Sequence, residues 1–208
     1  MTLLYLVRHG EAAESAGRAV GHLDLGLSAA GSRDIAALAG SWRGPRPRRI
    51  FSSDLRRAAD SARLLAAPLG AAVTLDPRLR ELSFGEWEGL PWDEIHRRDA
   101  ARFAAWGERW WEVPPPGGES FAALSERVLA WFSEVMGEAT VEEEDALVAV
   151  AHGGSLRALL AVLLALPREE LFELRLDCAR VSAVAVGEAG SDLLFVNRDR
   201  FADPAAIG

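Results

Sequence analysis

The sequence predicts an α/β protein built as a three-layer sandwich, in which a mostly parallel central sheet carries helices on both faces. Two apolar runs, residues 3–7 and 146–151, each end at a glycine-bearing turn. Such runs are typical of strands buried on both faces in the middle of a parallel sheet. Strand-like and helix-like segments also alternate over residues 1–75, which indicates parallel strands joined by helices.

The elements of the first half follow from apolar spacing and from capping residues. A helix begins after Ser28, whose hydroxyl suits the N-cap position, and runs to about Trp42 before the proline-bearing segment 44–47. A second helix begins at residues 54–58, carries apolar side chains at helical spacing, and ends at Gly70. Strands are expected at residues 3–7, 49–52 and 72–75.

Residues 82–118 interrupt this alternation. They hold five of the seven tryptophans and end in a run of proline and glycine, 114–118. We interpret the segment as a small helical cover inserted over the sheet edge, within one domain that spans residues 1–208. Beyond it we expect a helix at residues 120–138, capped by Ser120, and a charged loop at residues 142–145. A strand at residues 146–151, a helix at residues 156–166 and a terminal hairpin at residues 181–196 complete the chain.

The length and charge of the chain narrow the classes of function. Its 208 residues suffice for one α/β domain with a sizeable core. A net charge of -8 argues against a nucleic-acid binder that relies on a basic face. The chain contains no lysine, which excludes Schiff-base chemistry and a P-loop. Its 23 basic residues are therefore all arginines, which suit the binding of phosphate or carboxylate groups.

Cysteine content and the lengths of the apolar runs bear on the compartment. The single cysteine, Cys178, allows no internal disulfide and lies among apolar residues, so we interpret it as a small core side chain in a reducing compartment. The N-terminal apolar run is too short for a signal peptide or a membrane span, and no later run is long enough. We therefore expect a soluble, cytoplasmic protein that binds neither nucleic acid nor membrane; a homodimer stays open.

An arginine and two histidines follow the two central strands. Arg8 and His9 come directly after residues 3–7, and His152 comes directly after residues 146–151. Parallel neighbouring strands would bring both histidines to one sheet edge, where open α/β sheets bind their ligands. Arg8 and His9 alone would fit an ordinary strand end, but the matching second histidine favours a functional anion site. The two remaining histidines match no motif and are expected to be exposed: His22 and His96.

Further motifs extend this pattern in order along the chain. They are Arg8-His9-Gly10-Glu11; Gly21, Asp24, Leu27-Ser28 and Gly31; Ser52-Ser53-Asp54-Leu55 with Arg57-Ala58; Leu79-Arg80-Glu81 with Gly85 and Glu88-Gly89; Gly117-Gly118-Glu119-Ser120; and His152-Gly153 with Ser155-Leu156-Arg157. In this series the chain resembles the histidine phosphatase superfamily, which has the phosphoglycerate-mutase-like fold. Its length and its Gly-Gly-Glu-Ser element most resemble the branch of α-ribazole phosphatases and broad-specificity phosphatases.

The resemblance implies a phosphomonoesterase that forms a phosphohistidine and needs neither a metal nor another cofactor. His9 would attack phosphorus, and Glu81 would protonate the departing alcohol and later take a proton from water. The groups that would hold the charged phosphoryl oxygens are Arg8, Arg57 and His152. Arg56 competes with Arg57 for this role, but the pattern of the family that the chain resembles, with Ala58 after the arginine, favours Arg57. Additional substrate contacts are expected from Gly10, Ser15, Gly21, Gly153 and Arg109.

The substrate and the alternatives stay open at this point. We expect a small phosphorylated metabolite, either α-ribazole 5'-phosphate or another bulky phosphomonoester, because the tryptophans of residues 82–118 offer flat faces for a ring, unless they only pack the cover. The first alternative is a phosphoglycerate mutase, although Glu108 precedes Arg109 where mutases usually carry two arginines. The second is a non-catalytic phospholigand-binding protein, which the presence of both His9 and Glu81 disfavours.

Overall fold

The computed structural model describes residues 1–43, 46–137, 146–187 and 189–202. Residues 44 and 45 of the expected helix break at 44–47, the last residue of the expected helix 120–138 and the expected charged loop at residues 142–145 lie outside them.

The described strands form one six-stranded sheet in the order β3-β2-β4-β1-β5-β6. Their bounds are Thr2–Arg8 (β1), Arg49–Ser52 (β2), Ala72–Leu75 (β3), Ala146–Ala151 (β4), Val181–Gly187 (β5) and Gly190–Arg198 (β6). Strands β1 to β4 pair in parallel, whereas β5 and β6 are antiparallel to their neighbours. The predicted mostly parallel sheet and its terminal hairpin are therefore confirmed, with β1 and β4 side by side at the centre.

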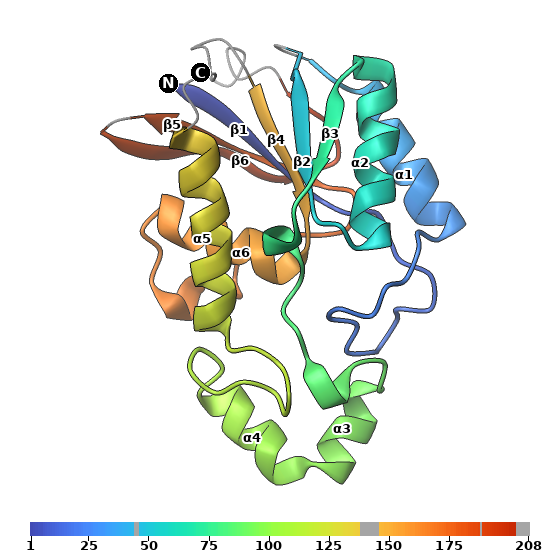
Figure 1. Cartoon of the computed structure of the whole chain (residues 1–208), viewed down its shortest axis with the longest axis vertical. Coiled ribbons are helices and arrows are strands. Elements are labelled where there is room, and N and C mark those ends of the chain that lie inside the picture. The colour runs from blue at the N-terminus through green and yellow to red at the C-terminus, as the bar shows by residue number, and fades with distance from the viewer. Residues whose placement is uncertain (44–45, 138–145, 188, 203–208) are drawn as a thin grey trace.

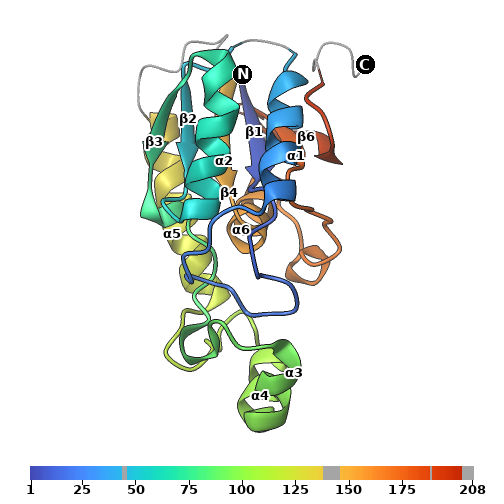
Figure 2. The ribbon, with the colours of Figure 1, turned by 90° about the vertical axis from the view of Figure 1, so that its right-hand side faces the viewer.

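Two helices pack on each face of the sheet (Figures 1 and 2). They are α1 (Ala29–Gly40) and α2 (Arg56–Ala66) on one face, and α5 (Phe121–Gly137) and α6 (Gly153–Leu163) on the other. In β1, Tyr5 and Val7 are buried in the apolar cluster that includes α1 and α2. Leu4 and Leu6, which alternate with them, are buried in the cluster that includes α5 and α6. The predicted three-layer sandwich is therefore confirmed, because the central strand is apolar on both faces.

The helices begin close to where the sequence predicts them, with one difference. The hydroxyls of Ser28 and Ser120 accept backbone hydrogen bonds from the first turns of α1 and α5. Helix α6 begins at Gly153 and not at Leu156, because the extended residue His152 forms its N-cap directly after β4. Shorter 3-10 turns lie at Ala67–Leu69, Pro77–Leu79, Gly85–Trp87 and Arg168–Glu170.

Segment 82–118 lies beyond the carboxyl ends of the parallel strands (Figure 1). It contains two short helices, α3 (Trp92–Arg98) and α4 (Ala100–Glu108). Trp87 and Ile95 are buried in a small apolar cluster of this segment, and the Trp87 indole N–H donates to Asp99 at 3.0 Å. The same cluster includes the buried Ala19, so the segment packs together with the chain that follows β1 and lies next to the sheet edge that carries the two histidines.

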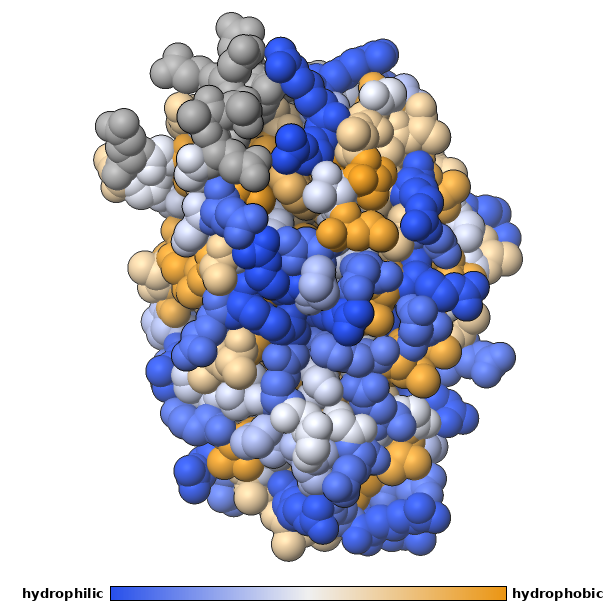
Figure 3. All heavy atoms as spheres, viewed as in Figure 1, coloured by the Kyte–Doolittle hydropathy of each residue, from blue (hydrophilic) through white to orange (hydrophobic). Residues whose placement is uncertain are grey.

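Hydrophobic residues lie in small, scattered groups on the face shown in Figure 3, which is mostly hydrophilic. In the described part of the chain, no helix is both long enough and apolar enough to cross a lipid bilayer.

Candidate active site

The two histidines meet at the carboxyl edge of the central strands. The parallel register of β1 and β4 pairs Arg8 with Ala151, so the next residue of each strand, His9 and His152, leaves the sheet at the same level. The N–H of His9 donates to the carbonyl of Ala151 at 3.0 Å. The ring centroids of the two histidines are 4.8 Å apart. The expectation that both lie at one sheet edge is therefore confirmed.

The tautomer of His9 follows from its hydrogen bond to the next residue. Its Nδ1 lies 2.6 Å from the carbonyl oxygen of Gly10, and a carbonyl can only accept, so we assign the ring proton to Nδ1. Burial, and then the charge of Arg57, lower the pKa of His9 to about 3. The ring is therefore neutral at ordinary pH, with an unprotonated Nε2 that can act as a nucleophile.

The second histidine is oriented by a serine. His152 is fully buried, and its Nε2 lies 2.9 Å from the hydroxyl oxygen of Ser53. That oxygen accepts a hydrogen bond from the Leu55 N–H, and Nε2 is the one acceptor that the hydrogen bonds of the described residues offer to the hydroxyl proton, so we assign this proton to the bond with Nε2. The imidazole proton is then on Nδ1, which has no hydrogen-bond partner in the described part of the chain. Burial, and then nearby His9, lower the pKa of His152, which makes it a neutral donor.

Backbone carbonyls orient two arginines at this edge. Arg57 is only 2% exposed, and its guanidinium donates to the carbonyls of Gly21 at 2.7 Å and Leu23 at 2.9 Å. Arg8 donates to the carbonyl of Leu176 at 2.6 Å. Neither guanidinium has a carboxylate within ion-pair distance among the described residues. Both positive charges therefore remain available to an anion. Arg56, in contrast, is exposed.

Two backbone groups hold the carboxyl group of Glu81. It accepts hydrogen bonds from the N–H of Leu82 and from the N–H of Gly154, both at 2.9 Å. Because Gly154 lies in the first turn of α6, the positive end of that helix faces the carboxyl group. A Cβ atom at residue 154 would lie 2.3 Å from Oε1 of Glu81, so only glycine allows this close contact.

The backbone of Glu81 is held by residues that the sequence analysis missed. The Arg127 guanidinium donates to the carbonyl of Glu81 and is paired with Glu119, and the His22 ring lies 2.8 Å from the same carbonyl. The expectation that His22 is exposed is wrong: it is half-buried because its ring bonds this loop. His96 is exposed, as expected. Of these residues, Glu119 is the one that a sequence motif had already singled out, as the glutamate of the Gly-Gly-Glu-Ser element.

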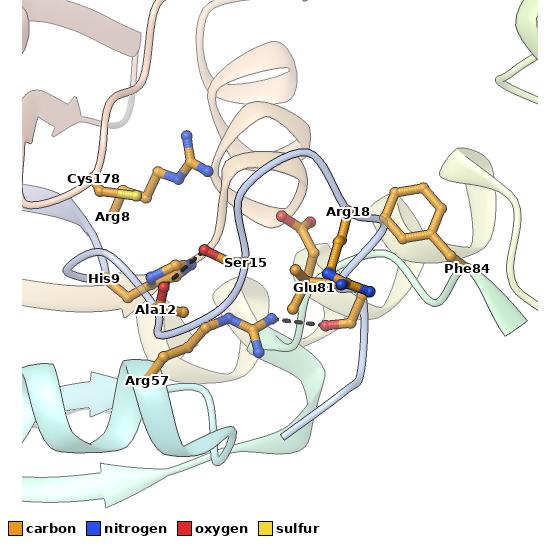
Figure 4. Close-up of a pocket in the computed structure, with 11 residues that line it drawn as sticks. Arg8, His9, Ala12, Ser15, Arg18, Arg57, Glu81, Phe84 and Cys178 are labelled. Carbon is orange, nitrogen blue, oxygen red and sulfur yellow. Dashed lines mark hydrogen bonds between the residues drawn. The ribbon is translucent and has the colours of Figure 1, made fainter. Parts of the chain in front are cut away.

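Four of these groups, His9, Arg8, Arg57 and Glu81, line a pocket of about 220 Å³ (Figure 4). His152 is fully buried next to His9 and is not part of the pocket lining. That lining combines the predicted residues Arg8, His9, Ser15, Gly21, Arg57 and Glu81 with Ala12, Arg18, Val20, Phe84 and Cys178. The interpretation of Cys178 as a core residue is wrong, because it is half-buried in this wall. Burial raises the pKa of its thiol, so it is not a ready thiolate.

The remaining predicted residues lie at different distances from this pocket. Ser15 is in its wall, where the hydroxyl donates to the carbonyl of Ala12 at 2.8 Å. Gly10 is buried behind His9, and its N–H donates to the hydroxyl of Ser61. Gly153 lines a neighbouring pocket, and Arg109 is exposed at the end of α4, outside the lining of both pockets.

The arrangement suits the binding and transfer of a phosphoryl group. The pocket wall brings together an unprotonated imidazole nitrogen, a carboxyl group and three guanidinium groups, of Arg8, Arg18 and Arg57, which have no carboxylate partner among the described residues. The neutral ring of His152 lies next to that of His9, at 4.8 Å between centroids. Cations and donors at this density stabilise the charge that develops on phosphoryl oxygens during transfer. Among the described residues, no three histidine, cysteine, aspartate or glutamate side chains form a group that could hold a metal ion.

Comparisons of the sequence and of the structure with known proteins all lead to phosphatases. A family model described as histidine phosphatase superfamily (branch 1) matches residues 4–199. The glucosyl-3-phosphoglycerate phosphatase of Mycolicibacterium vanbaalenii is 37% identical over 171 residues, which cover 79% of this chain and 75% of the relative. The adenosylcobalamin/alpha-ribazole phosphatase of Escherichia coli is 30% identical over 93% of this chain and 95% of the relative. The crystal structure of an alpha-ribazole phosphatase from Shigella flexneri superposes with a TM-score of 0.87 at 28% identity, covering 97% of this chain and 98% of that one.

Proposed function

Because the chain belongs to the histidine phosphatase superfamily, we propose that it is a phosphomonoesterase that forms a phosphohistidine at His9 and needs no metal ion. The observation that carries this proposal is the hydrogen bond from Nδ1 of His9 to Gly10, because it leaves Nε2 unprotonated in the wall of the pocket. A neutral imidazole nitrogen next to guanidinium groups is suited to attack an anionic phosphorus centre.

In the first step, Nε2 of His9 forms a bond to phosphorus while the bond from phosphorus to the ester oxygen breaks. Glu81 gives its proton to the departing oxygen, so the leaving group departs as a neutral alcohol. The guanidinium groups of Arg8 and Arg57 and the Nδ1–H of His152 stabilise the charge on the three other phosphoryl oxygens. The products of this step are the alcohol, a phosphohistidine and a Glu81 carboxylate.

In the second step, the carboxylate of Glu81 takes a proton from water while the water oxygen bonds to phosphorus. The bond between phosphorus and Nε2 of His9 breaks, which releases inorganic phosphate and returns His9 and Glu81 to their starting protonation. The backbone N–H groups of Leu82 and Gly154 support both steps, because they keep the carboxyl group at the pocket wall.

We propose that the substrate is a small phosphorylated metabolite with a bulky alcohol, of which α-ribazole 5'-phosphate is one candidate. The reported relatives are named for α-ribazole and for glucosyl-3-phosphoglycerate, so their names alone do not choose between substrates. We prefer the phosphatase to the mutase because the reported relatives are phosphatases, and because Arg109, where mutases usually carry one of two arginines, lies outside both pocket linings. We also propose a cytoplasmic location, because a single cysteine allows no internal disulfide.

The proposal is tested by turnover of p-nitrophenyl phosphate. His9→Ala is expected to abolish release of p-nitrophenol. Glu81→Gln is expected to slow turnover and to accumulate an acid-labile phosphoenzyme in a rapid-quench experiment with radiolabelled substrate. In this variant the first step still proceeds, because p-nitrophenolate leaves without a proton. The second step is slow, because no base activates the water that attacks the phosphohistidine.

His96→Ala is the matched control, because this histidine is exposed and lies outside the pocket. Its rate should equal that of the unmodified protein, and a chelator should leave that rate unchanged. Undiminished turnover by His9→Ala would overturn the mechanism. Loss of activity with a chelator, restored by a divalent ion, would overturn the metal-independent reaction.

A further inference from the structure

A second pocket, of about 200 Å³, adjoins the phosphate pocket. The two pockets share Arg8, Glu81 and Phe84 as lining residues. Most of the remaining wall of the second pocket is aromatic, with the side chains of Trp92, Trp106, Trp110, Phe121 and Phe172. We call it the aromatic pocket. The cover thus uses its tryptophans in two ways, because Trp87 is buried in the centre of the cover and lines neither pocket.

The position of Glu81 decides which part of a substrate enters the aromatic pocket. In the proposed reaction Glu81 protonates the leaving oxygen, which lies opposite the attacking Nε2 of His9 in an in-line displacement. Glu81 lies in the wall of both pockets, whereas His9 lines the phosphate pocket but not the aromatic pocket. The alcohol part of the substrate therefore extends into the aromatic pocket.

The aromatic walls are supported by one another, so the pocket exists before a ligand binds. The rings of Trp92 and Trp106 are nearly parallel, at 10°, with centroids 6.1 Å apart. The ring of Trp110 packs edge-on against Phe121 at 5.0 Å and against Phe172 at 4.8 Å. Such walls suit either a flat ring or a quaternary ammonium group.

The charge of Arg157 decides between these two ligands. Its guanidinium carbon lies 5.8 Å from the centre of the Phe172 ring, and it lines the aromatic pocket together with Arg8. It donates to the carbonyls of Gly153 and Leu174, both at 3.1 Å, and has no carboxylate within ion-pair distance in the described part of the chain. In the proposed reaction Arg8 is paired with the phosphate and Glu81 carries a proton, so Arg157 gives the aromatic pocket a positive charge. This charge repels an ammonium ion and favours a neutral or anionic ring.

The volume of the pocket limits the size of that ring. An apolar cavity of roughly 150 Å³ holds one benzene molecule, so a pocket of this size admits one ring or two fused rings. We infer that the alcohol part of the substrate carries a flat, uncharged or anionic aromatic ring of that size, bound in the aromatic pocket. This inference rests on the proposed phosphomonoesterase function.

The test compares three phosphate esters of primary alcohols: 2-(1-naphthyl)ethyl phosphate, n-butyl phosphate and phosphocholine. Because all three leave as primary alcohols, differences in kcat/KM report recognition of the alcohol part more than its basicity. We expect the naphthyl ester to exceed the butyl ester about 10-fold, and phosphocholine to be the poorest substrate. Phe172→Ala should reduce the naphthyl-to-butyl ratio several-fold, since Phe172 is 58% exposed and its removal spares the core.

Val162→Ala is the matched control, because Val162 is 50% exposed on α6 and lines neither pocket; its ratio should not change. Arg157→Gln should raise the relative kcat/KM for phosphocholine. Equal kcat/KM for the three esters, or a preference for phosphocholine, would overturn the inference while leaving the phosphatase intact. A protein that hydrolyses neither these esters nor p-nitrophenyl phosphate would instead overturn the proposed function on which the inference rests.

Discussion

Hydrogen bonds to the backbone orient several of the side chains to which we assign the chemistry. His9 donates to Gly10, and Arg57 donates to Gly21 and Leu23. A buried cation needs hydrogen-bond acceptors, and carbonyl oxygens supply them without neutralising its charge. The carbonyls near residues 21–23 therefore let Arg57 remain buried and still attract a phosphate dianion into a protein whose net charge is -8.

Replacement of Arg57 tests this arrangement at the level of one side chain. Arg57→Ala is expected to lower kcat/KM for p-nitrophenyl phosphate by ~100- to 1000-fold, by analogy with the loss of one donor to a developing oxyanion. Arg57→Lys should recover only part of this loss, because an ammonium group lacks the planar fork that bonds two carbonyls. Arg56→Ala is the control and should stay within about 3-fold of the unmodified protein. If Arg56→Ala had the larger effect, Arg56 and not Arg57 would be the phosphate ligand.

At the level of elements, helix α5 holds the loop that carries Glu81. Arg127 of this helix donates to three carbonyls that precede or belong to Glu81, those of Arg78, Arg80 and Glu81. Glu119, just before α5, pairs with Arg127 and also accepts from the N–H of Ser83 on the far side of Glu81. The loop is therefore fastened on both sides of Glu81, which makes Arg127 a positioning residue for the proton transfer.

Arg127→Met tests this role, because methionine keeps much of the length and removes the donors. We expect kcat for an alkyl phosphate to fall by ~10- to 100-fold, since a small displacement of an acid is costly. The loss for p-nitrophenyl phosphate should be smaller, because p-nitrophenolate needs no proton in order to leave. The inhibition constant of inorganic phosphate should not change.

Arg78→Met is the control for Arg127→Met. It lies on the same loop, but its side chain pairs with Asp76 and Glu134 near the surface. Its effect on both substrates should be small. Equal losses for the alkyl and the p-nitrophenyl ester in Arg127→Met would show that Arg127 only stabilises the fold.

At the level of the whole molecule, the burial of two neutral histidines couples folding to pH. The pKa of His9 is about 3 in the folded protein, against an ordinary value of 6.5, because burial and the charge of Arg57 disfavour its protonated form. As the pH falls below 6.5, the imidazole of His9 binds a proton in the unfolded chain but stays unprotonated in the folded protein. The contribution of His9 to the free energy of unfolding is therefore complete above about pH 6.5 and is lost as the pH falls towards 3.

Urea unfolding at pH 7 and pH 4 measures this coupling. His9 alone is expected to lower the free energy of unfolding by about 3 kcal/mol between these two pH values. The buffer must contain no phosphate, which would stabilise the folded protein by binding to it. In His9→Asn, the free energy of unfolding should change less between pH 7 and pH 4 than in the unmodified protein. In the exposed control His96→Asn, it should change as much as in the unmodified protein. An equal pH dependence in His9→Asn would mean that other groups cause it.

The sequence by itself determined which residues end the central strands. Apolar runs define β1 and β4, parallel pairing aligns their ends, and this alone brings His9 and His152 to one edge. The apolar runs are local patterns, and the alignment of strand ends follows from a general rule of parallel pairing. The meeting of the two histidines can therefore be predicted without knowing how side chains pack. The assignment of chemical roles to these residues, in contrast, came from the family resemblance.

Only the tertiary structure decided what surrounds that edge. No local pattern connects Arg127 with the carbonyl of Glu81, or places Cys178 in a pocket wall and not in the core. The sequence also could not divide the tryptophans of the cover between the buried centre, where Trp87 lies, and the aromatic pocket, which Trp106 lines. Most of these contacts join residues from different elements, and their geometry depends on how whole elements pack, which spacing along a single element does not encode.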